Sequence, residues 1–392
     1  MIDKAIHVGE IVEVAIESVA FGGSGVGRVG PVVIFVPFTA PGDVVEARVV
    51  TVKKSYLTGE IVRIMSPSAD RSEPVCPHFS RCGGCQYQHL SYDVQLRIKE
   101  RQAAETFERI GKVIAPPVKS IVPSPRPFGY RGKAEFHGTS AGEKGRLGFM
   151  DTGGGEVVDV DRCAIVDESI NSELARLRER ITPERIPPGR RRYILWSRVS
   201  YPPRRYVTRR VGEMDLTVPS GGFFQGNLFL TETLVERTVE SCASEEPDRV
   251  LDACCGSGLF SLFLAPRVRE VIGVEISGAA VRCAERNAER HNITNARFMQ
   301  GDLDVVLTGM ASKEERFDTV LIDPPRTGCT PATLAAIDHL RPGRIVYVSC
   351  NPATQARDVR RLIDGGFSLE TLLPMDMFPQ TQHIEVIAVL IR

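Results

Sequence analysis

The stretch Arg249-Val250-Leu251-Asp252-Ala253-Cys254-Cys255-Gly256-Ser257-Gly258 decides the fold. It reads as a strand that ends in a glycine turn, and the following residues through Ala265 predict a helix. A second predicted strand, 271–275, ends in the carboxylate of Glu275, 19 residues after Gly256. Rossmann-like folds hold a nucleoside in this way, because the acid accepts hydrogen bonds from ribose hydroxyls. The full G-x-G-x-x-G pattern is missing, so the adenosyl part of S-adenosylmethionine is favoured over a dinucleotide.

Two further predicted strands end in reactive side chains. Asp323 follows the apolar run 319–322, and Cys350 follows the strand-forming run 345–348 with one serine between them. Asn351-Pro352 then ends the strand. Open α/β sheets bind their ligands beyond the carboxyl ends of the strands, so both side chains are expected at the site. A small cysteine packed at a strand end is the alternative for Cys350.

The composition is that of a soluble globular protein of two or three domains, with 392 residues, 42% hydrophobic and 25% charged. No apolar run reaches the roughly 18 residues of a membrane span, and the first residues do not resemble a signal peptide, so a cytoplasmic location is expected. The 49 basic residues balance the 49 acidic ones, which neither supports nor excludes a nucleic-acid partner. Ten cysteines in a reducing compartment indicate metal binding or catalysis rather than disulfides.

Short alternating runs between residues 8 and 65 predict a small all-β barrel, since glycine-rich turns separate them. The segment resembles the TRAM domain, an OB-like RNA-binding module, notably at Val36-Pro37 and Pro41-Gly42-Asp43. A plain scaffold barrel is the alternative.

A cysteine cluster follows the barrel and predicts a metal centre. Its thiols are Cys76, Cys82 and Cys85, with Cys163 as the expected fourth ligand. Three clustered thiolates and one distant thiolate favour a 4Fe-4S cluster. Zinc is the lesser alternative, with His78 and His89 as further ligands.

The remaining pattern divides the chain into three units. Residues 93–110 predict a helix, and the region 190–210 interleaves arginines with aromatic residues, a mixture that can hold phosphates and stack unpaired bases. A solvated basic face is the alternative for this region. The expected units are an OB-like barrel (1–66), a central β-rich domain (67–92 and 118–217) and a Rossmann-like catalytic domain (93–117 and 218–392).

Together these residues resemble the uracil-C5 RNA methyltransferase family, in its iron-sulfur, TRAM-bearing branch, over almost the whole chain. Ser349-Cys350-Asn351-Pro352 matches the family's nucleophile motif, and the four cysteines match its 4Fe-4S ligands. His383-Ile384-Glu385 resembles the segment that carries the general base. The resemblance implies that Cys350 is the nucleophile and Glu385 the base.

The resemblance also implies contacts with the methyl donor. Phe223-Phe224-Gln225 is similar to the motif whose glutamine touches the donor. The expected donor contacts are Gln225, Cys254, Gly256, Gly258, Leu259, Glu275, Asp302 and Asp323. The family more often has Phe at 254 and Asn at 259. This chain has Cys254 and Leu259 instead, which affects the side-chain contacts at these two positions and leaves the backbone turn intact.

The chemistry of uracil methylation explains why a cysteine and a base are needed. Uracil C5 is a poor carbon nucleophile, so a thiolate first adds to C6 and makes an enolate whose C5 can attack the donor methyl group. A base must then remove the C5 proton before the cysteine can leave. The target uridine also has to leave its stack, which gives the barrel and the arginine-rich region an RNA-holding task.

Two other functions compete with this reading. The first is an amino-group methyltransferase, because Asp323-Pro324-Pro325-Arg326 is similar to a motif of these enzymes, which need no nucleophile. The second is a non-catalytic RNA-binding protein with a metal-stapled domain. For the uridine methyltransferase, 23S ribosomal RNA is the expected substrate and transfer RNA the alternative. A monomer is expected.

Overall fold

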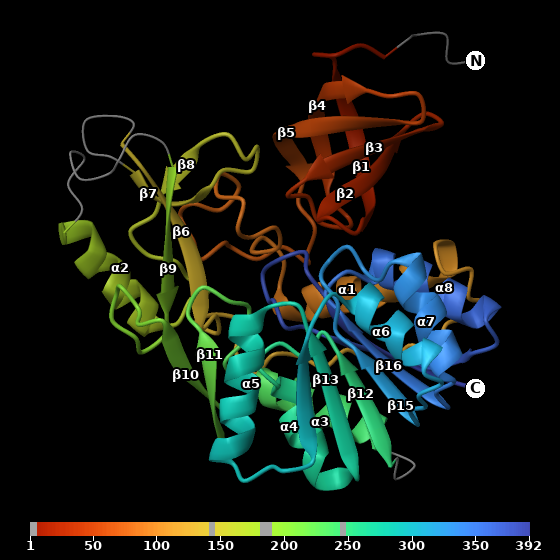
Figure 1. The fold of residues 1–392 in the computed structure, drawn as a ribbon. Helices are drawn as coiled ribbons and strands as arrows, with labels where there is room; N and C mark the ends of the chain where they lie inside the picture. The colour runs from red at the N-terminus through yellow and green to blue at the C-terminus, as the bar shows by residue number, and fades with distance from the viewer. Residues whose placement is uncertain (1–5, 141–145, 181–189, 244–247) are drawn as a thin grey trace.

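The computed structural model describes residues 6–140, 146–180, 190–243 and 248–392. It contains an N-terminal barrel, a central four-stranded sheet and a large C-terminal sheet with helices (Figure 1). The barrel stands above the place where the other two parts meet (Figure 1). None of the helices within these ranges combines the length and the apolarity that a membrane crossing requires.

The barrel predicted from the N-terminal pattern is confirmed. It closes in the order β1-β2-β3-β5-β4 around a core that includes Val14, Ile34 and Leu57. Its strands are β1 (Ile11–Val19), β2 (Ser24–Val29), β3 (Val32–Pro37), β4 (Val44–Val52) and β5 (Tyr56–Ser66).

The predicted helix at 93–110 is α1 (Tyr92–Arg109). Ala103 and Phe107 of α1 are fully buried and belong to the core of the C-terminal sheet. The loops before α1 carry three of the clustered cysteines, so α1 connects that region to the C-terminal sheet.

The central part holds two separate sheets. The four-stranded sheet has the order β8-β7-β6-β9, and a two-stranded hairpin pairs β10 with β11. The strands are β6 (Lys133–Thr139), β7 (Arg146–Met150), β8 (Val157–Asp159), β9 (Arg190–Trp196), β10 (Tyr206–Val211) and β11 (Met214–Pro219), with helix α2 (Glu168–Arg180). Ile170 and Leu174 of α2 pack in the core of the four-stranded sheet.

The C-terminal sheet has seven strands in the order β14-β13-β12-β15-β16-β18-β17. The first five run parallel, and β18 pairs antiparallel with both β16 and β17. The strands are β12 (Arg249–Ala253), β13 (Glu270–Glu275), β14 (Ala296–Gln300), β15 (Thr319–Ile322), β16 (Arg344–Ser349), β17 (Ser368–Met375) and β18 (Glu385–Ile391).

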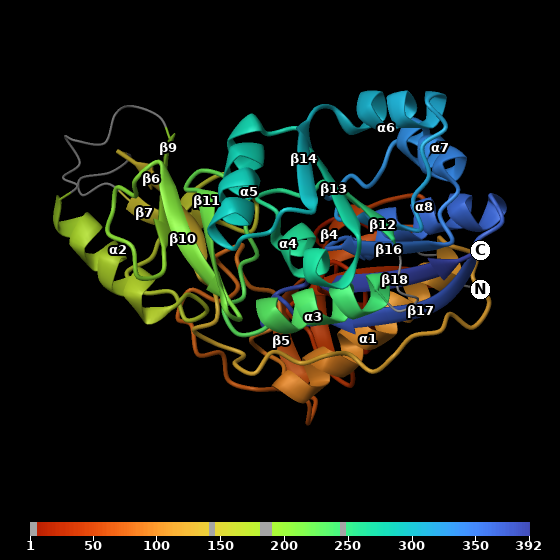
Figure 2. The ribbon, with the colours of Figure 1, turned by 60° about the horizontal axis from the view of Figure 1, so that its bottom comes forward.

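Helices cover both faces of this sheet, as a doubly wound α/β fold requires (Figure 2). Residues of α3, α4 and α5 share one core with the sheet, and residues of α1, α6, α7 and α8 share the other. The helices are α3 (Thr231–Cys242), α4 (Leu259–Leu264), α5 (Gly278–Arg290), α6 (Leu303–Ser312), α7 (Pro331–Leu340) and α8 (Pro352–Asp364), with a short 3-10 turn η2 (Ala265–Arg267) after α4.

Two segments link the central part to the C-terminal sheet. Val118 and Val122 form bridges with Leu372 and Met375 of β17, so the first residues after Pro116-Pro117 follow the edge of the seven-stranded sheet. In the hairpin, the Thr217 N–H donates to Asn287 Oδ1 of α5 at 2.7 Å. The order of the strands places the topological switch between β12 and β15, at the edge where the ligand of an open sheet is expected.

Candidate active site

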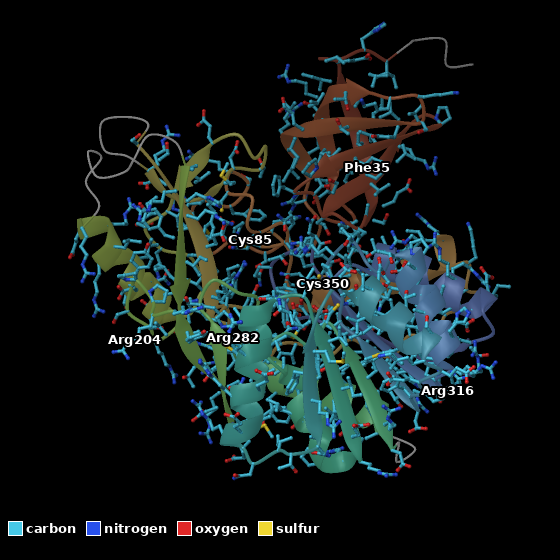
Figure 3. All side chains as sticks on the ribbon, viewed as in Figure 1. Phe35, Cys85, Arg204, Arg282, Arg316 and Cys350 are labelled. Carbon is cyan, nitrogen blue, oxygen red and sulfur yellow. The ribbon has the colours of Figure 1, made fainter. Side chains whose placement is uncertain are left out.

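Cys350 lies between two acidic residues at the carboxyl end of the parallel strands. It directly follows β16, whose neighbours in the sheet are β15 and β18. Asp323 follows β15, and Glu385 is the first residue of β18, where Val386 stands opposite Ser349. Figure 3 places Cys350 near the centre of the molecule, where the three parts of the chain converge. The fold therefore brings the proposed nucleophile and two possible bases to one edge.

The backbone after Cys350 is fixed by a helix cap. Asn351 caps α8, since its Oδ1 accepts from the Ala353 N–H at 3.2 Å. Its Nδ2 donates to the Arg326 carbonyl at 3.0 Å, and Ser349 Oγ accepts from the Asn351 N–H at 3.1 Å. The cap thus ties the cysteine to the loop that follows Asp323.

The environment of Cys350 favours the neutral thiol. The pKa of Cys350 is raised to about 11, chiefly by burial and also by the nearby Glu385 carboxylate, although the Arg326 guanidinium beside the thiol acts to lower it. Arg326 is therefore the group that stabilises the thiolate. Arg326 was not predicted as a site residue, although its position just after a strand tip, in Asp323-Pro324-Pro325-Arg326, was a signal for one.

Glu385 and Asp323 both hold protons more tightly than ordinary carboxyl groups. Burial raises the pKa of Glu385 well above its usual range, the Asp323 charge adds to this, and Arg326 opposes it. Burial also raises the pKa of Asp323, and the Asp252 charge adds to that effect. A raised pKa makes a carboxylate a stronger base, as proton removal from carbon requires.

The glycine turn predicted after β12 is present and bends sharply. Cys254, Gly256 and Gly258 all have positive φ angles, of 69°, 57° and 86°. A side chain built on Gly256 would meet no atom within 4 Å, so the space above the turn is open. Burial raises the pKa of Cys254, so its partly exposed side chain is expected to be a neutral thiol.

Glu275 closes the turn from the neighbouring strand. Its Oε2 accepts from the Gly256 N–H at 3.1 Å, and its Oε1 accepts from the Ser277 N–H at 2.8 Å. Asp302 lies beyond the end of β14, which pairs with β13, and it caps α6 by accepting from the Asp304 N–H at 3.0 Å. The two acids therefore occupy adjacent strand ends, as the donor assignment requires.

Gln225 and Leu259 differ in what they offer a ligand. Gln225 is buried, and its Oε1 atom has no hydrogen-bond partner in the described part of the chain. Such an atom is expected to meet a ligand, because leaving a buried acceptor unpaired costs about 1 to 3 kcal/mol. Leu259 is also buried, but it packs in the core with α3 and α4, so its side chain contributes packing below the turn.

The four predicted metal ligands meet around one cavity. Cys76, Cys82, Cys85 and Cys163 line a space of about 40 Å³, together with His78. The pKa of Cys82 is raised to about 11 and that of Cys85 to about 12, chiefly by burial and also by the neighbouring thiols.

The predicted metal ligands do not form a recognisable site for a single metal ion. Among the described residues, no group of three or more His, Cys, Asp or Glu side chains is placed to hold a metal ion. His89 also differs from the zinc alternative, because it does not line the cavity and its Nε2 lies 3.1 Å from the Thr39 carbonyl of the barrel. The four thiols thus line one space, and His89 lies outside it.

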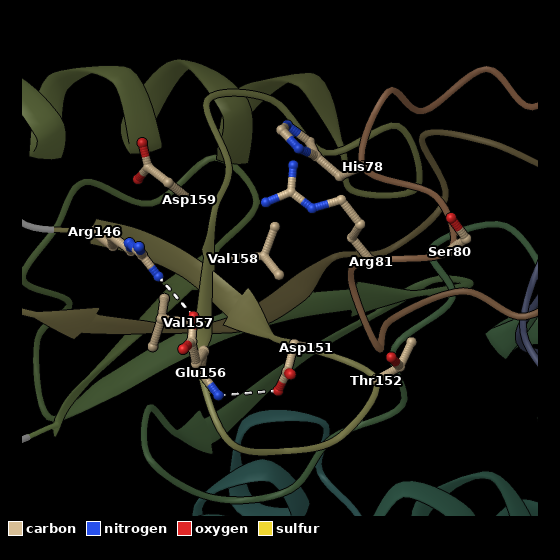
Figure 4. Close-up of a pocket in the computed structure, with 10 residues that line it drawn as sticks. All are labelled: His78, Ser80, Arg81, Arg146, Asp151, Thr152, Glu156, Val157, Val158 and Asp159. Atoms are coloured by element: carbon tan, nitrogen blue, oxygen red, sulfur yellow. Dashed lines mark hydrogen bonds and ion pairs between the residues drawn. The ribbon is translucent and has the colours of Figure 1, made fainter. Parts of the chain in front are cut away.

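A larger hollow of about 530 Å³ lies on the central sheet, beside the cysteine loops (Figure 4). His78 and Arg81 line it, but its acidic residues are engaged with protein groups. Glu156 pairs with Arg146 at 3.0 Å, and Asp151 accepts from the Glu156 N–H (Figure 4). The hollow contains none of the predicted catalytic residues, so the chemistry is placed at Cys350.

Comparisons with known proteins find related proteins along almost the whole chain. A family model described as tRNA (Uracil-5-)-methyltransferase matches residues 210–392, and a TRAM domain model matches residues 7–62. An uncharacterized RNA methyltransferase of Halalkalibacterium halodurans is 34% identical over 98% of this chain and 98% of its own length. A tRNA (uracil(54)-C(5))-methyltransferase of Schizosaccharomyces pombe is 34% identical over 97% of this chain and 78% of its own length.

A solved structure extends the similarity to the fold. The Pyrococcus abyssi tRNA (uracil-54, C5)-methyltransferase, in complex with S-adenosyl-L-homocysteine, is 26% identical, with a TM-score of 0.75. The match covers 97% of this chain and 100% of that chain. Family model, relatives and structure all point to an enzyme that binds S-adenosylmethionine and acts on RNA. This chain belongs to the uracil-C5 RNA methyltransferase family.

Proposed function

We propose that this enzyme methylates C5 of one uridine in a structured RNA through a covalent bond between Cys350 and C6 of the uracil. The observation that supports this most is the position of Cys350 at a strand end between Asp323 and Glu385. Amino-group methyltransferases need no thiol at this place. A non-catalytic RNA-binding protein needs neither the thiol nor the open glycine turn.

Each residue at the strand end has a separate task in this reaction. The Cys350 thiolate, stabilised by the Arg326 guanidinium, adds to C6 and leaves an enolate at C5. C5 then takes the methyl group that S-adenosylmethionine supplies from its sulfonium. Glu385 removes the remaining C5 proton, the double bond re-forms, and the Cys350 sulfur leaves as a thiolate. The product is 5-methyluridine.

The donor is assigned to the open turn after β12. Its ribose hydroxyls are expected to meet Glu275, as in other Rossmann-like folds, with Asp302 at the next strand end. The unpaired Oε1 of Gln225 is assigned to the donor side of the site. Asp323 is assigned to the donor as well, because it follows β15, which lies between β12 and β16 in the sheet. Gly256 and Gly258 provide the close backbone approach, with Cys254 and Leu259 flanking it.

The other units are assigned to RNA. The barrel (1–66) and the central part (67–92 and 118–217) would hold the RNA while the target uridine leaves its stack and enters the catalytic part (93–117 and 218–392). A monomer is proposed as the active form, because neighbouring strands of one sheet supply all the proposed catalytic groups.

The four cysteines are assigned to a 4Fe-4S cluster. In such a cluster each of four thiolates binds its own iron, so the ligands surround the cluster instead of one ion. The observation that supports this assignment is that the four thiols line one cavity. Methyl transfer moves no net electrons, so the assigned role is to hold the loops around the cavity in place.

Two classes of RNA are candidate substrates. The TRAM barrel combined with the cysteine centre favours 23S ribosomal RNA. The second candidate is transfer RNA, because the two named relatives from Schizosaccharomyces pombe and Pyrococcus abyssi are described as acting on uracil 54 of tRNA. Mapping of 5-methyluridine in both RNA classes from a deletion strain decides between them.

RNA that contains 5-fluorouridine tests the covalent route. Fluorine at C5 leaves no proton to remove after methylation, so the RNA should remain bonded to Cys350 in a complex that survives denaturing electrophoresis. Cys350→Ala should give no such complex while still binding the donor. Methylation of ordinary RNA by Cys350→Ala at the wild-type rate would refute the proposal.

A further inference from the structure

The segment that leads into Glu385 is held by the loop of cysteine ligands. The Gln380 carbonyl accepts hydrogen bonds from the N–H groups of Gln86 and Tyr87, both at 3.0 Å. Gln86 directly follows Cys85, which lines the thiol cavity. Gln380 has a positive φ of 69°, so its carbonyl is held in a conformation that L-residues rarely adopt. The backbone bonds thus join two loops that are far apart in the sequence.

The Gln86 side chain adds a bridge between the same two loops. Its Nε2 donates to the Gly83 carbonyl at 2.8 Å, inside the loop between Cys82 and Cys85. Its Oε1 accepts from the Gln382 N–H at 3.2 Å, three residues before Glu385. One amide group therefore connects the interior of the cysteine loop to the start of the strand that carries the proposed base.

Other buried bonds hold the earlier part of this segment. Lys99 Nζ lies 2.6 Å from Asp376 Oδ1 and donates to the Phe378 carbonyl at 3.0 Å. Gln95 and Gln380 exchange two hydrogen bonds, each 3.0 Å long. These contacts anchor residues 376–380 on α1. The Gln86 side chain extends the anchoring to Gln382, next to the residues that contribute to the site.

The barrel covers this bridge with a glycine turn. A side chain at Gly23 would place its Cβ 2.9 Å from the Gln86 Cβ, and Gly23 has a φ of 89°. Both its conformation and the close approach therefore require glycine. The barrel, the cysteine loop and the catalytic segment consequently meet at Gln86.

We propose that Gln86 is a positioning residue for Glu385, so that the shape of the cysteine loop is transmitted to the step that removes the C5 proton. The inference rests on the proposed role of Glu385 as the base. Gln86 does not touch the reacting atoms in this scheme. Its loss should let residues 382–385 shift and should slow proton removal more than thiol addition or methyl transfer.

The test measures two rates in Gln86→Ala with a saturating donor and a defined RNA. Formation of the covalent RNA complex should stay within about twofold of wild type, while its resolution to free 5-methyluridine RNA should slow about tenfold. Gln86→Glu keeps an acceptor for the Gln382 N–H but loses the donor to the Gly83 carbonyl, so it should recover only part of the resolution rate. Amide hydrogen exchange at residues 381–385, measured without RNA, should rise in Gln86→Ala.

Gln102→Ala is the matched control. Gln102 is a buried glutamine at the same junction, and its Nε2 donates to the Val19 carbonyl at 2.9 Å and to Tyr87 Oη at 3.1 Å. Its loss should lower stability and leave the ratio of the two rates unchanged. Equal slowing in both variants would show a general loss of structure and would overturn the positioning role.

Glu385→Gln separates this inference from the function on which it rests. If Glu385→Gln accumulates the methylated complex and Gln86→Ala resolves it at the wild-type rate, the positioning role is wrong and the base assignment stands. If Glu385→Gln fails to accumulate the complex, the base assignment itself is wrong. In the double variant, Gln86→Ala should add no further slowing to Glu385→Gln, because it acts through that residue.

Discussion

Asp323 and Glu385 lie on opposite sides of Cys350, because Asp323 follows β15, Glu385 begins β18, and both strands pair with β16. Burial raises the pKa of both carboxyl groups, and each has a further carboxylate nearby that adds to the shift. Arg326 lowers the pKa of both Glu385 and Cys350. The site thus combines two carboxyl groups with raised pKa values, one thiol and one cation at the edge shared by β15, β16 and β18.

The charge of Arg326 and that of Glu385 should shift the reactivity of Cys350 in opposite directions. Arg326→Met should raise the pKa of Cys350, since the guanidinium lowers it, and should slow alkylation of this thiol at pH 8 by about tenfold. Glu385→Gln should lower the pKa and speed alkylation, since the carboxylate raises it. Mass spectrometry of the Cys350 peptide after timed iodoacetamide treatment measures both rates.

Arg316→Met is the control for this experiment. Arg316 lies far from Cys350 (Figure 3), and it donates to the His339 carbonyl. Its loss should leave alkylation unchanged. If Arg326→Met and Arg316→Met give the same rate, the guanidinium of Arg326 does not act on the thiol.

Glu275 should control donor affinity. Glu275→Ala removes the carboxylate expected to accept from the donor ribose, and the loss of one or two charge-assisted bonds of roughly 1.5 to 3 kcal/mol each implies at least about a tenfold weaker Kd. RNA affinity should stay nearly unchanged. Calorimetric titration with S-adenosyl-L-homocysteine measures the effect. Glu270→Ala is the control, because Glu270 lies at the other end of β13 and its loss should leave donor binding normal. An unaltered Kd in Glu275→Ala would show that the donor does not bind at Glu275.

Lys99 should be important for stability. Its ammonium group and Asp376 are both fully buried at 2.6 Å, so Lys99→Met leaves an unpaired buried carboxylate and should destabilise the catalytic part by roughly 3 to 5 kcal/mol. Arg101→Ala breaks an exposed pair with Glu105 on the same helix and should cost about 0.5 kcal/mol. Denaturant unfolding followed in both variants tests the difference, and similar midpoints would contradict it.

The cysteine centre should hold iron. Protein purified without oxygen is expected to be brown and to contain about four irons per chain, and Cys163→Ser should lose most of them. Cys242→Ser is the control, because Cys242 is buried in the core beside the seven-stranded sheet. Stoichiometric zinc without iron in the anaerobic wild type would contradict the cluster.

The sequence predicted those features that depend on neighbouring residues. The barrel, α1 and the strand ends at Glu275, Asp323 and Cys350 follow from local periodicity and turn residues, and the structure contains them. Parallel strands bring their carboxyl ends to one edge, so the gathering of these side chains also follows from the pattern.

Contacts between distant segments could not be predicted in this way. Lys99 pairs with a residue 277 positions away, and a helix lysine is ordinarily expected to be exposed. Gln86 reaches Gln382 over 296 positions. The Arg326 carbonyl is held by Asn351 and Thr354 at the start of α8, 25 and 28 positions away. No local sequence pattern predicts these pairs, because they form only when the folded parts of the chain pack against one another.

The fate of the covalent RNA complex in Glu385→Gln tests the central claim most directly. The variant keeps the size of the side chain and loses its basicity, so Cys350 should add to the uracil and the methyl group should transfer, but the C5 proton should remain. Radiolabelled methyl groups should then accumulate on RNA that stays attached to Cys350 through denaturing electrophoresis. Asp323→Asn should not accumulate this complex. If Asp323→Asn traps the methylated complex and Glu385→Gln does not, the base is Asp323 and the account given for Glu385 is wrong.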